Sequence, residues 1–315
     1  MKSKYDVIII GAGPAGIFAA LELTKQDENI DILMVDKGRT IEKRNCPARL
    51  TGKCVNCNPC SIVNGWAGAG AFSDGKLSQS TDVGGRIVDY IPEEKAEELI
   101  KYADEWYLKF GASEEVHGLN NRRVEDIMYE ASKHNIELIP CPVRHLGTEL
   151  SYEVLKKMYL HLINNTNTEF LELTMAKDII VEGDKVKGVV IEGKDKKTYN
   201  IEAKYVIAAP GREGATWLTG QAKKLGIKTE NNEVDIGVRV EVPNSIMDHL
   251  TKDLYEAKLV YYSDTFENKV RSFCMNPAGF VSEEHYDGEI AVVNGHSYSD
   301  KGLQSKNTNF ALLVS

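Results

Sequence analysis

The first forty residues constrain the fold of this chain most. An apolar run, Val7–Ile10, leads directly into Gly11-Ala-Gly13-Pro-Ala-Gly16, a helical stretch follows, and a second apolar run ends at Asp36. A strand, Gly-x-Gly-x-x-Gly, a helix, a second strand and an acidic residue in this order form the βαβ fingerprint of dinucleotide binding. The chain therefore predicts a Rossmann-like α/β domain.

Each residue of the turn has an expected role. Gly11 permits the sharp turn after the strand, Gly13 lets the backbone approach a pyrophosphate, and Gly16 lets the helix pack closely on the sheet. Pro14 and Ala15 open the helix, whose N-terminal N–H groups favour a phosphate.

Two residues at the end of the second strand complete the predicted nucleotide site. Asp36 is expected to accept hydrogen bonds from a ribose, and Lys37 follows it. The alternative is a tight strand-to-helix turn that binds nothing.

Composition excludes several classes of protein. The 315 residues suggest about two domains, and the net charge of −9 argues against a nucleic-acid partner. No apolar run approaches the length of a transmembrane helix. Six cysteines without a secretory signal predict the cytoplasm, with thiols reduced or bound to metal.

Periodicity organises the rest of the chain. Helical spacing predicts helices over 92–110 and 123–133, in a helical insertion at 92–145, and a further helix from a Ser151 cap to Asn164. Three apolar runs at 169–173, 179–182 and 186–191 predict an antiparallel meander before a strand that begins at Lys204.

From residue 233 onward short strands predict a mostly antiparallel α+β domain. They are expected at Ile236–Val242, Lys258–Tyr262, Val270–Met275 and Glu289–Asn294. The chain ends in a strand-like run, Phe310–Ser315, from which we expect the natural protein to continue.

Three segments resemble two-domain flavoproteins of the glutathione-reductase type. They are Tyr5–Gly16, Val35–Gly38 and Val206–Gly211, the last with Ala-Pro where those proteins carry Ala-Thr. The resemblance implies that the chain near Ala176 passes the adenine of FAD and that Ala209 and Gly211 lie near the dinucleotide.

Longer strings resemble the bacterial uncharacterised FAD-dependent, or NAD(FAD)-utilising, dehydrogenases. They are Cys54–Cys60, Gly68–Leu77, Arg144–Thr148, Ala209–Gly214, Asp235–Arg239 and Asn294–Ser297. The sequence predicts a discontinuous FAD-binding domain over 1–91 and 146–232 and an incomplete substrate domain over 233–315. The late Gly-Asp motif of such flavoproteins is missing, as expected of a truncated chain.

The glycine-rich segment Gly68–Lys76 has the small residues needed for close approach to a ligand. In the resemblance Gly68 and Gly70 lie along the pyrophosphate and flavin, and Asp74 and Lys76 bond the ribityl chain or flavin edge. The alternative is a loop that only crosses another segment. Since no second Gly-x-Gly-x-x-Gly unit exists, NAD(P)H is expected only as a transient donor.

Four cysteines lie within fifteen residues, at Cys46, Cys54, Cys57 and Cys60. Their spacing is typical of thiolate metal sites and of iron–sulfur ligation, although the usual fourth cysteine after Cys60 is absent. The sequence leaves three hypotheses open: a metal or iron–sulfur site, redox-active thiols, or inert reduced cysteines.

Four residues in the family-like strings are catalytic candidates. Arg144, His145, Arg239 and His296 suit anion binding or proton transfer beside a flavin, and each has the alternative of an ion-paired or hydrogen-bonded structural residue.

The function predicted from the sequence is two-electron transfer between FAD and NAD(P)H or a small organic substrate. The alternatives are an iron–sulfur flavoprotein that passes electrons to a protein partner, a non-enzymatic FAD-binding module, and a plain NAD dehydrogenase. The sequence predicts neither the substrate nor the oligomeric state.

Overall fold

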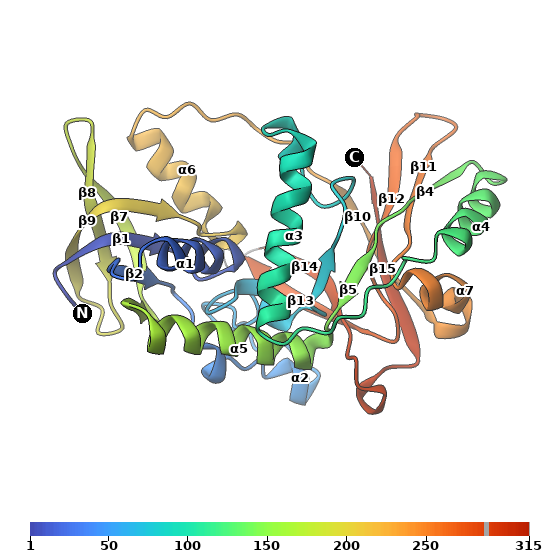
Figure 1. Cartoon of the computed structure of the whole chain (residues 1–315), viewed down its shortest axis with the longest axis horizontal. Coiled ribbons are helices and arrows are strands. Elements are labelled where there is room, and N and C mark those ends of the chain that lie inside the picture. Colours follow the sequence, from blue (N-terminus) through green and yellow to red (C-terminus); the bar gives the residue numbers. More distant parts are fainter. Residues whose placement is uncertain (287–289, 315) are drawn as a thin grey trace. The chain divides into compact units, whose positions relative to one another are not determined.

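The computed structural model describes residues 1–286 and 290–314, which form two compact units (Figure 1). The first unit comprises Met1–Ala71, Leu155–Asn231 and Glu283–Val292, and the second comprises Phe72–Val154, Asn232–Ser282 and Val293–Ser315.

The first unit is built on a six-stranded sheet in the order β6-β2-β1-β9-β8-β7. Strands β6, β2, β1 and β9 are parallel, and β9, β8 and β7 form an antiparallel meander. The strands are β1 (Lys4–Ile10), β2 (Ile32–Val35), β6 (Thr168–Leu171), β7 (Met175–Glu182), β8 (Lys185–Glu192) and β9 (Thr198–Ala208).

Short helices and 3₁₀ turns flank this sheet. They are α1 (Pro14–Gln26), η1 (Ile41–Lys43), α2 (Ala48–Thr51), η2 (Gly68–Phe72), η4 (Arg212–Gly214) and α6 (Ala215–Lys224). Helix α1 buries Ile17 and Leu21 against the sheet, because apolar residues recur on one of its faces. The buried Trp66 packs edge-on against Tyr159 and Phe170.

The second unit is built on a five-stranded antiparallel sheet in the order β10-β15-β12-β11-β4. Its strands are β4 (Ile136–Ile139), β10 (Ile236–Pro243), β11 (Lys258–Tyr262), β12 (Lys269–Asn276) and β15 (Asn307–Val314). A separate small pair joins β3 (Lys76–Ser78) to β5 (Val143–His145).

The helices and turns of the second unit are η3 (Ile87–Asp89), α3 (Glu93–Lys109), α4 (Asn121–Ser132), α7 (Asn244–Leu254) and η5 (Lys301–Leu303). Val124 and Ile127 of α4 share an apolar cluster with Met247 and Leu254 of α7. Four elements contribute residues to both units: η2, α5 (Gly147–Asn165), β13 (Phe280–Tyr286) and β14 (Ile290–His296).

The predicted α/β fold class is confirmed, with a parallel-containing sheet, a meander and an antiparallel α+β unit.

Two local predictions are wrong. Ser151 does not cap a helix, because α5 already begins at Gly147 and Ser151 is buried within it. The run at 169–173 is no part of the meander, because β6 pairs in parallel with β2. Of the strand predicted at 289–294, Glu289 lies outside the described residues.

The two units divide the chain differently from the predicted domains. Residues 92–145, predicted as a separate insertion, share a unit with most of 232–315. The reason is that β4 extends the antiparallel sheet by pairing with β11, from Lys258↔Ile139 to Tyr261↔Ile136. The functions predicted for the domains stay predictions.

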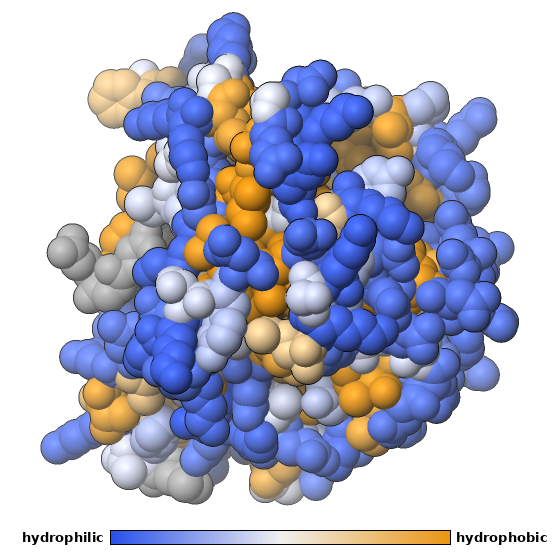
Figure 2. All heavy atoms as spheres, turned by 90° about the vertical axis from the view of Figure 1, so that its left-hand side faces the viewer, coloured by the Kyte–Doolittle hydropathy of each residue, from blue (hydrophilic) through white to orange (hydrophobic). Residues whose placement is uncertain are grey.

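The hydropathy of the surface and of the helices is in line with the absence of a long apolar run in the sequence. The face in Figure 2 is mostly hydrophilic, with apolar side chains in a central band and in smaller separate patches. Of the helices in the described part of the chain, none combines the length and apolar character needed to cross a bilayer.

The first prediction concerns Gly16. A Cβ atom there would lie 2.0 Å from the Gly11 carbonyl oxygen, so Gly16→Ala is expected to lower the free energy of unfolding by about 3 kcal/mol or more. Urea denaturation followed by circular dichroism measures this loss.

The matched control is Gly220→Ala in α6, where no described atom lies within 4 Å of the added Cβ. Alanine is the better helix former, so this variant is expected to gain roughly 0.5–1 kcal/mol. If Gly16→Ala were as stable as the parent, the close packing of α1 on the β1 turn would be contradicted.

Candidate functional site

The turn between β1 and α1 is built from close backbone contacts. Gly11 has φ +100°, a conformation that favours glycine, and its N–H donates to the Val35 carbonyl at 2.8 Å. A Cβ at Gly11 would lie 2.1 Å from the Ala209 oxygen, and Ala209 N–H donates to the Ile10 carbonyl at 2.8 Å. The fold itself therefore requires Gly11 and Gly16.

Gly13 differs from these two glycines. No described atom lies within 4 Å of the position its Cβ would take, so packing within the described chain does not require glycine there. Gly13 is the N-cap of α1, and Pro14 is the first helical residue. Since the first N–H groups of a helix have no intrahelical partners, this open space faces donors that favour an anion.

The Asp36 carboxylate holds three segments of backbone together. It accepts hydrogen bonds from the N–H groups of Ala12 at 3.0 Å, Gly38 at 2.8 Å and Gly65 at 2.8 Å. A carboxylate has about four acceptor sites, so capacity for a ribose hydroxyl remains after these three bonds. The ribose role of Asp36 stays a prediction beside this structural one.

The glycine-rich segment lies against the start of α1. Ala67 N–H donates to the Ala12 carbonyl at 2.6 Å. A Cβ at Gly68 would lie 3.3 Å from Gly13 Cα, and one at Gly70 would lie 3.9 Å from Pro14 Cγ. The small residues predicted to approach a cofactor therefore adjoin the open space at Gly13.

The remaining nucleotide candidates of the first unit lie just after strands β2 and β9 or within β7. Gly211 has φ +63°, and no described atom lies within 4 Å of its Cβ position. Lys37 pairs with Glu213 at 2.7 Å, and Ala176 is buried in β7. Their contacts with a nucleotide stay predictions.

Sequence reasoning missed Arg44, which organises the cysteine- and glycine-rich segment. Its buried guanidinium donates to the carbonyls of Ser61 at 2.9 Å, Ile62 at 2.7 Å and Gly68 at 2.7 Å, and also to that of Trp66. Burial lowers its pKa to about 10. Its partners are backbone carbonyls, which leave no signal in a sequence.

The four cysteines of the predicted metal site have unequal surroundings. Cys46 is buried, Cys54 is exposed, and Cys57 and Cys60 are half-buried, all as free thiols. In residues 1–286 and 290–314, no group of three or more ligand atoms within 4.8 Å contains Cys46, Cys57 or Cys60. The four-cysteine ligand set stays a prediction.

Two catalytic candidates, Arg144 and Arg239, have structural partners in the second unit. Arg144 forms a two-pronged ion pair with Asp104, at 2.7 Å for each bond. Arg239 donates to the Asn309 side-chain oxygen at 2.6 and 2.9 Å and to the Cys274 carbonyl at 2.8 Å. Their catalytic roles stay predictions.

The two histidine candidates are enclosed. His296 is buried, stacks on Phe280 and lies 3.5 Å from the Thr148 hydroxyl through Nδ1. His145 stacks on Tyr255 with ring centroids 4.1 Å apart, and its Nε2 lies 3.1 Å from the Ser297 hydroxyl. Burial, together with the charge of Lys76, lowers the pKa of His145 to about 3, so it is neutral near pH 7.

Lys76 is the centre of a buried charge cluster. Its ammonium lies 2.8 Å from Glu256, 3.4 Å from Asp74 and 2.8 Å from the Met275 carbonyl. Burial alone would lower the pKa of Lys76, but the two carboxylates outweigh it and raise the pKa well above its ordinary value. Burial raises the pKa of Glu256, but Lys76 and Lys258 outweigh it and lower the pKa to about 2.

Asp74 is the member of the cluster whose carboxylate has one oxygen without a hydrogen-bond partner in the described structure. It is fully buried, and its Oδ2 has no hydrogen-bond partner within the described structure. Burial raises its pKa despite the opposing charge of Lys76. A buried carboxyl group whose pKa is raised keeps its proton to higher pH than an exposed one does.

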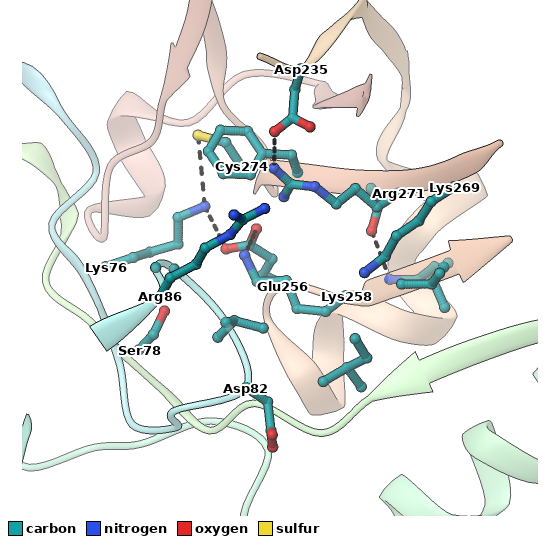
Figure 3. Close-up of a pocket in the computed structure, with 18 of the residues that line it drawn as sticks. Lys76, Ser78, Asp82, Arg86, Asp235, Glu256, Lys258, Lys269, Arg271 and Cys274 are labelled. Carbon is teal, nitrogen blue, oxygen red and sulfur yellow. Dashed lines mark hydrogen bonds and ion pairs between the residues drawn. The ribbon is translucent and has the colours of Figure 1, made fainter. Parts of the chain in front are cut away.

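This cluster lines a pocket of about 830 Å³ in the second unit (Figure 3). Lys76, Glu256 and Cys274 lie on one part of its wall, and Arg86 and Arg271 extend the charged lining. Its size suits a small organic molecule, and its charges suit a polar one.

Strained backbone adjoins the same pocket. Tyr255 has φ +59° and Cys274 has φ +46°, both rare for residues with side chains. A register shift between Phe273 and Asn276 marks a bulge in β12, and the Met275 carbonyl within it accepts from Lys76. Bulges and strained residues gather at functional sites, which makes this pocket the second candidate site.

Two segments match known family models. Residues 5–70 match the pyridine nucleotide-disulphide oxidoreductase family, and residues 233–315 match the FAD-dependent protein, C-terminal domain-like family. The first segment contains the β1–α1 turn, Asp36 and Gly68. These matches support FAD, and they leave NAD(P)H and an iron–sulfur cluster as predictions.

Curated relatives include proteins from a bacterium and an archaeon. An uncharacterized protein of Clostridium beijerinckii is 28% identical over 99% of this chain and 52% of its own length, so the chain spans about half of that relative. A digeranylgeranylglycerophospholipid reductase of Methanosarcina mazei is 34% identical over 30% of this chain and 25% of its own length.

Solved structures include L-amino acid deaminase from Proteus myxofaciens in complex with anthranilate, at TM-score 0.43 and 13% identity, with 99% of this chain and 59% of that one covered. THI4 of Thermovibrio ammonificans has TM-score 0.39 and 15% identity, with 71% and 64% covered. Likenesses at these TM-scores do not identify a function.

The second prediction concerns the pH dependence of stability. Between pH 6.5 and about 3 the unfolded chain binds a proton at His145 that the folded chain does not. Stability therefore falls as pH falls through this window, by about 1.4 kcal/mol per pH unit. Urea unfolding at pH 7 and pH 5 is expected to show that His145→Gln reduces the acid-induced loss by about 2 kcal/mol.

The matched control is His249→Gln, at an exposed position of α7. The ionisation of Glu256 does not interfere, because its protonation window lies between pH 4.5 and about 2. An unchanged difference between pH 7 and pH 5 in His145→Gln would show that the buried imidazole does not titrate in this way.

Proposed function

We propose that this chain is the cofactor- and substrate-binding part of an FAD-dependent oxidoreductase. The reaction is two-electron transfer between FAD and a reduced nicotinamide or a small polar organic substrate. The observation that carries the proposal is the contrast within one turn, where Gly11 and Gly16 are required by packing and Gly13 faces open space at a helix N-terminus. A glycine that packing does not require is explained by a ligand that approaches the backbone.

The residues present fit an adenine dinucleotide. The α1 N-terminus and Gly13 would hold the pyrophosphate, and Asp36 has capacity left for a ribose hydroxyl. Gly68 and Gly70 leave room beside the same turn. When bound, FAD supplies the two-electron chemistry.

The pocket of the second unit is the proposed substrate site. Its charged lining selects a polar molecule, and Asp74 is the group proposed to hold or release a proton there. Lys76 fixes the orientation of Glu256 through a buried ion pair.

The proposal includes a family and a cellular location. The two matched segments support membership of the bacterial FAD-dependent dehydrogenases named above. The six cysteines are free thiols in the described structure, which supports a reducing compartment such as the cytoplasm.

The third prediction tests the cofactor. Gly13→Val is expected to lower the FAD content of the purified protein at least tenfold, because the side chain fills the space proposed for the pyrophosphate. Since no described atom contacts that space, the circular dichroism spectrum and the unfolding midpoint should change little. The absorbance spectrum of the protein and of released flavin measures the content.

The matched control is Gly220→Val, which also adds a side chain into open space but lies in α6. It is expected to retain the FAD content of the parent. A fully yellow Gly13→Val protein would overturn the nucleotide site, and a parent protein that binds no FAD would overturn the proposed function. Bleaching of the flavin by NADH or NADPH without oxygen tests the donor.

A further inference from the structure

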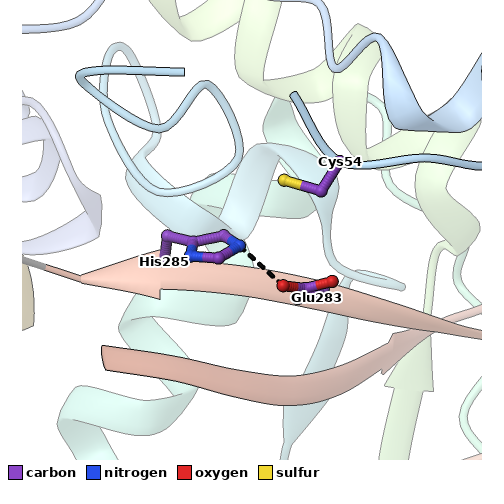
Figure 4. A group of neighbouring side chains, drawn as sticks. All are labelled: Cys54, Glu283 and His285. Atoms are coloured by element: carbon purple, nitrogen blue, oxygen red, sulfur yellow. Dashed lines mark ion pairs between the residues drawn. The ribbon is translucent and has the colours of Figure 1, made fainter. Parts of the chain in front are cut away.

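We propose that Cys54, Glu283 and His285 form a binding site for a zinc-class divalent cation. Each residue offers one ligand atom, a sulfur, a carboxylate oxygen or an imidazole nitrogen, and the three atoms lie within 4.8 Å of one another (Figure 4). All three residues belong to the first unit. The site is independent of the proposed flavin chemistry.

Strand geometry supplies two of the ligands. Glu283 and His285 lie two residues apart in β13, so their side chains project from the same face of the strand. His285 Nε2 lies 2.7 Å from a Glu283 carboxylate oxygen. The fold therefore already holds two ligand atoms close together, and a metal site needs only a third donor beside them.

The opposite face of the same strand is anchored. Glu284 and Tyr286 are buried and hydrogen-bonded to each other. Arg212 lies 3.6 Å from the Glu284 carboxylate and stacks its guanidinium over the Tyr286 ring at 4.7 Å. This anchoring holds the strand so that the ligand pair faces the cysteine-rich segment.

Cys54 supplies the third donor from that segment. Its sulfur is exposed and accepts from the Asn56 N–H at 3.5 Å, within a turn where Asn56 has φ +50°. The thiolate is the form that ligates a metal.

The His285 Nε2 atom lacks a hydrogen-bond partner in the described structure, which favours a bound ligand at this position. Its Nε2 is buried and, in the part of the chain that the structure describes, has no hydrogen bond, although Glu283 is close. The approach therefore lacks hydrogen-bond geometry. A cation bound by both the imidazole nitrogen and a carboxylate oxygen would satisfy both groups.

Sulfur, nitrogen and oxygen donors together suit zinc better than calcium or magnesium. Three protein ligands leave one tetrahedral position for water. This ligand set shares only Cys54 with the four-cysteine set predicted from the sequence, so the two hypotheses are separable by mutation.

The fourth prediction tests this site with cobalt as the probe. Chelator-treated, reduced protein titrated with Co²⁺ is expected to bind one equivalent, with tetrahedral visible bands and a thiolate-to-cobalt charge-transfer band, and to lose both on addition of Zn²⁺. Cys54→Ser should lose the charge-transfer band. Glu283→Gln and His285→Ala should each weaken binding by roughly tenfold or more, on the scale seen for metal-site mutations.

The matched controls are Cys46→Ser, Cys57→Ser and Cys60→Ser, which should keep the cobalt spectrum and affinity. Loss of the spectrum in these variants, with His285→Ala unaffected, would overturn the proposal in favour of the four-cysteine set. Absence of any stoichiometric cobalt binding in the folded parent protein, checked by circular dichroism, would also overturn it.

Discussion

The Asp36 carboxylate is the interaction on which the first unit depends most. A single side chain at the end of β2 accepts from the β1–α1 turn, from its own following loop and from Gly65. These segments are far apart in sequence, and each would otherwise leave a buried N–H unpaired, at a cost of about 1–3 kcal/mol. The carboxylate therefore sets the positions of the backbone around the space in front of Gly13.

Arg44 has a complementary role in the glycine-rich segment. The Asp36 carboxylate accepts hydrogen bonds from backbone N–H groups, and the Arg44 guanidinium donates to the carbonyls of Ser61, Ile62 and Gly68. A loop with so little regular structure would otherwise bury many unpaired backbone groups. Two charged side chains of opposite sign thus replace the hydrogen-bond ladder that a helix or strand would provide.

The sequence predicted those parts of the structure that depend on local pattern. The helices at 14–26 and 93–109 and the strands of the second sheet follow from periodicity, and the β1–α1 turn follows from its glycine spacing. The parallel partner of β6 depended on a crossover between distant residues, which periodicity does not encode. The sequence also gave no sign of the roles of Arg44 and Tyr255, because their partners are backbone atoms or residues far away in sequence.

The charges buried in the second unit are best explained by function. Replacing a buried ion pair with apolar residues often leaves a protein as stable or makes it more stable, so stability alone does not account for Lys76 between Glu256 and Asp74. The cluster also adjoins Cys274, whose strained backbone typically costs about 1–3 kcal/mol. Two costly features on the wall of one pocket, beside a carboxyl oxygen without a hydrogen-bond partner in the described structure, are what a site built for a polar reactant would retain.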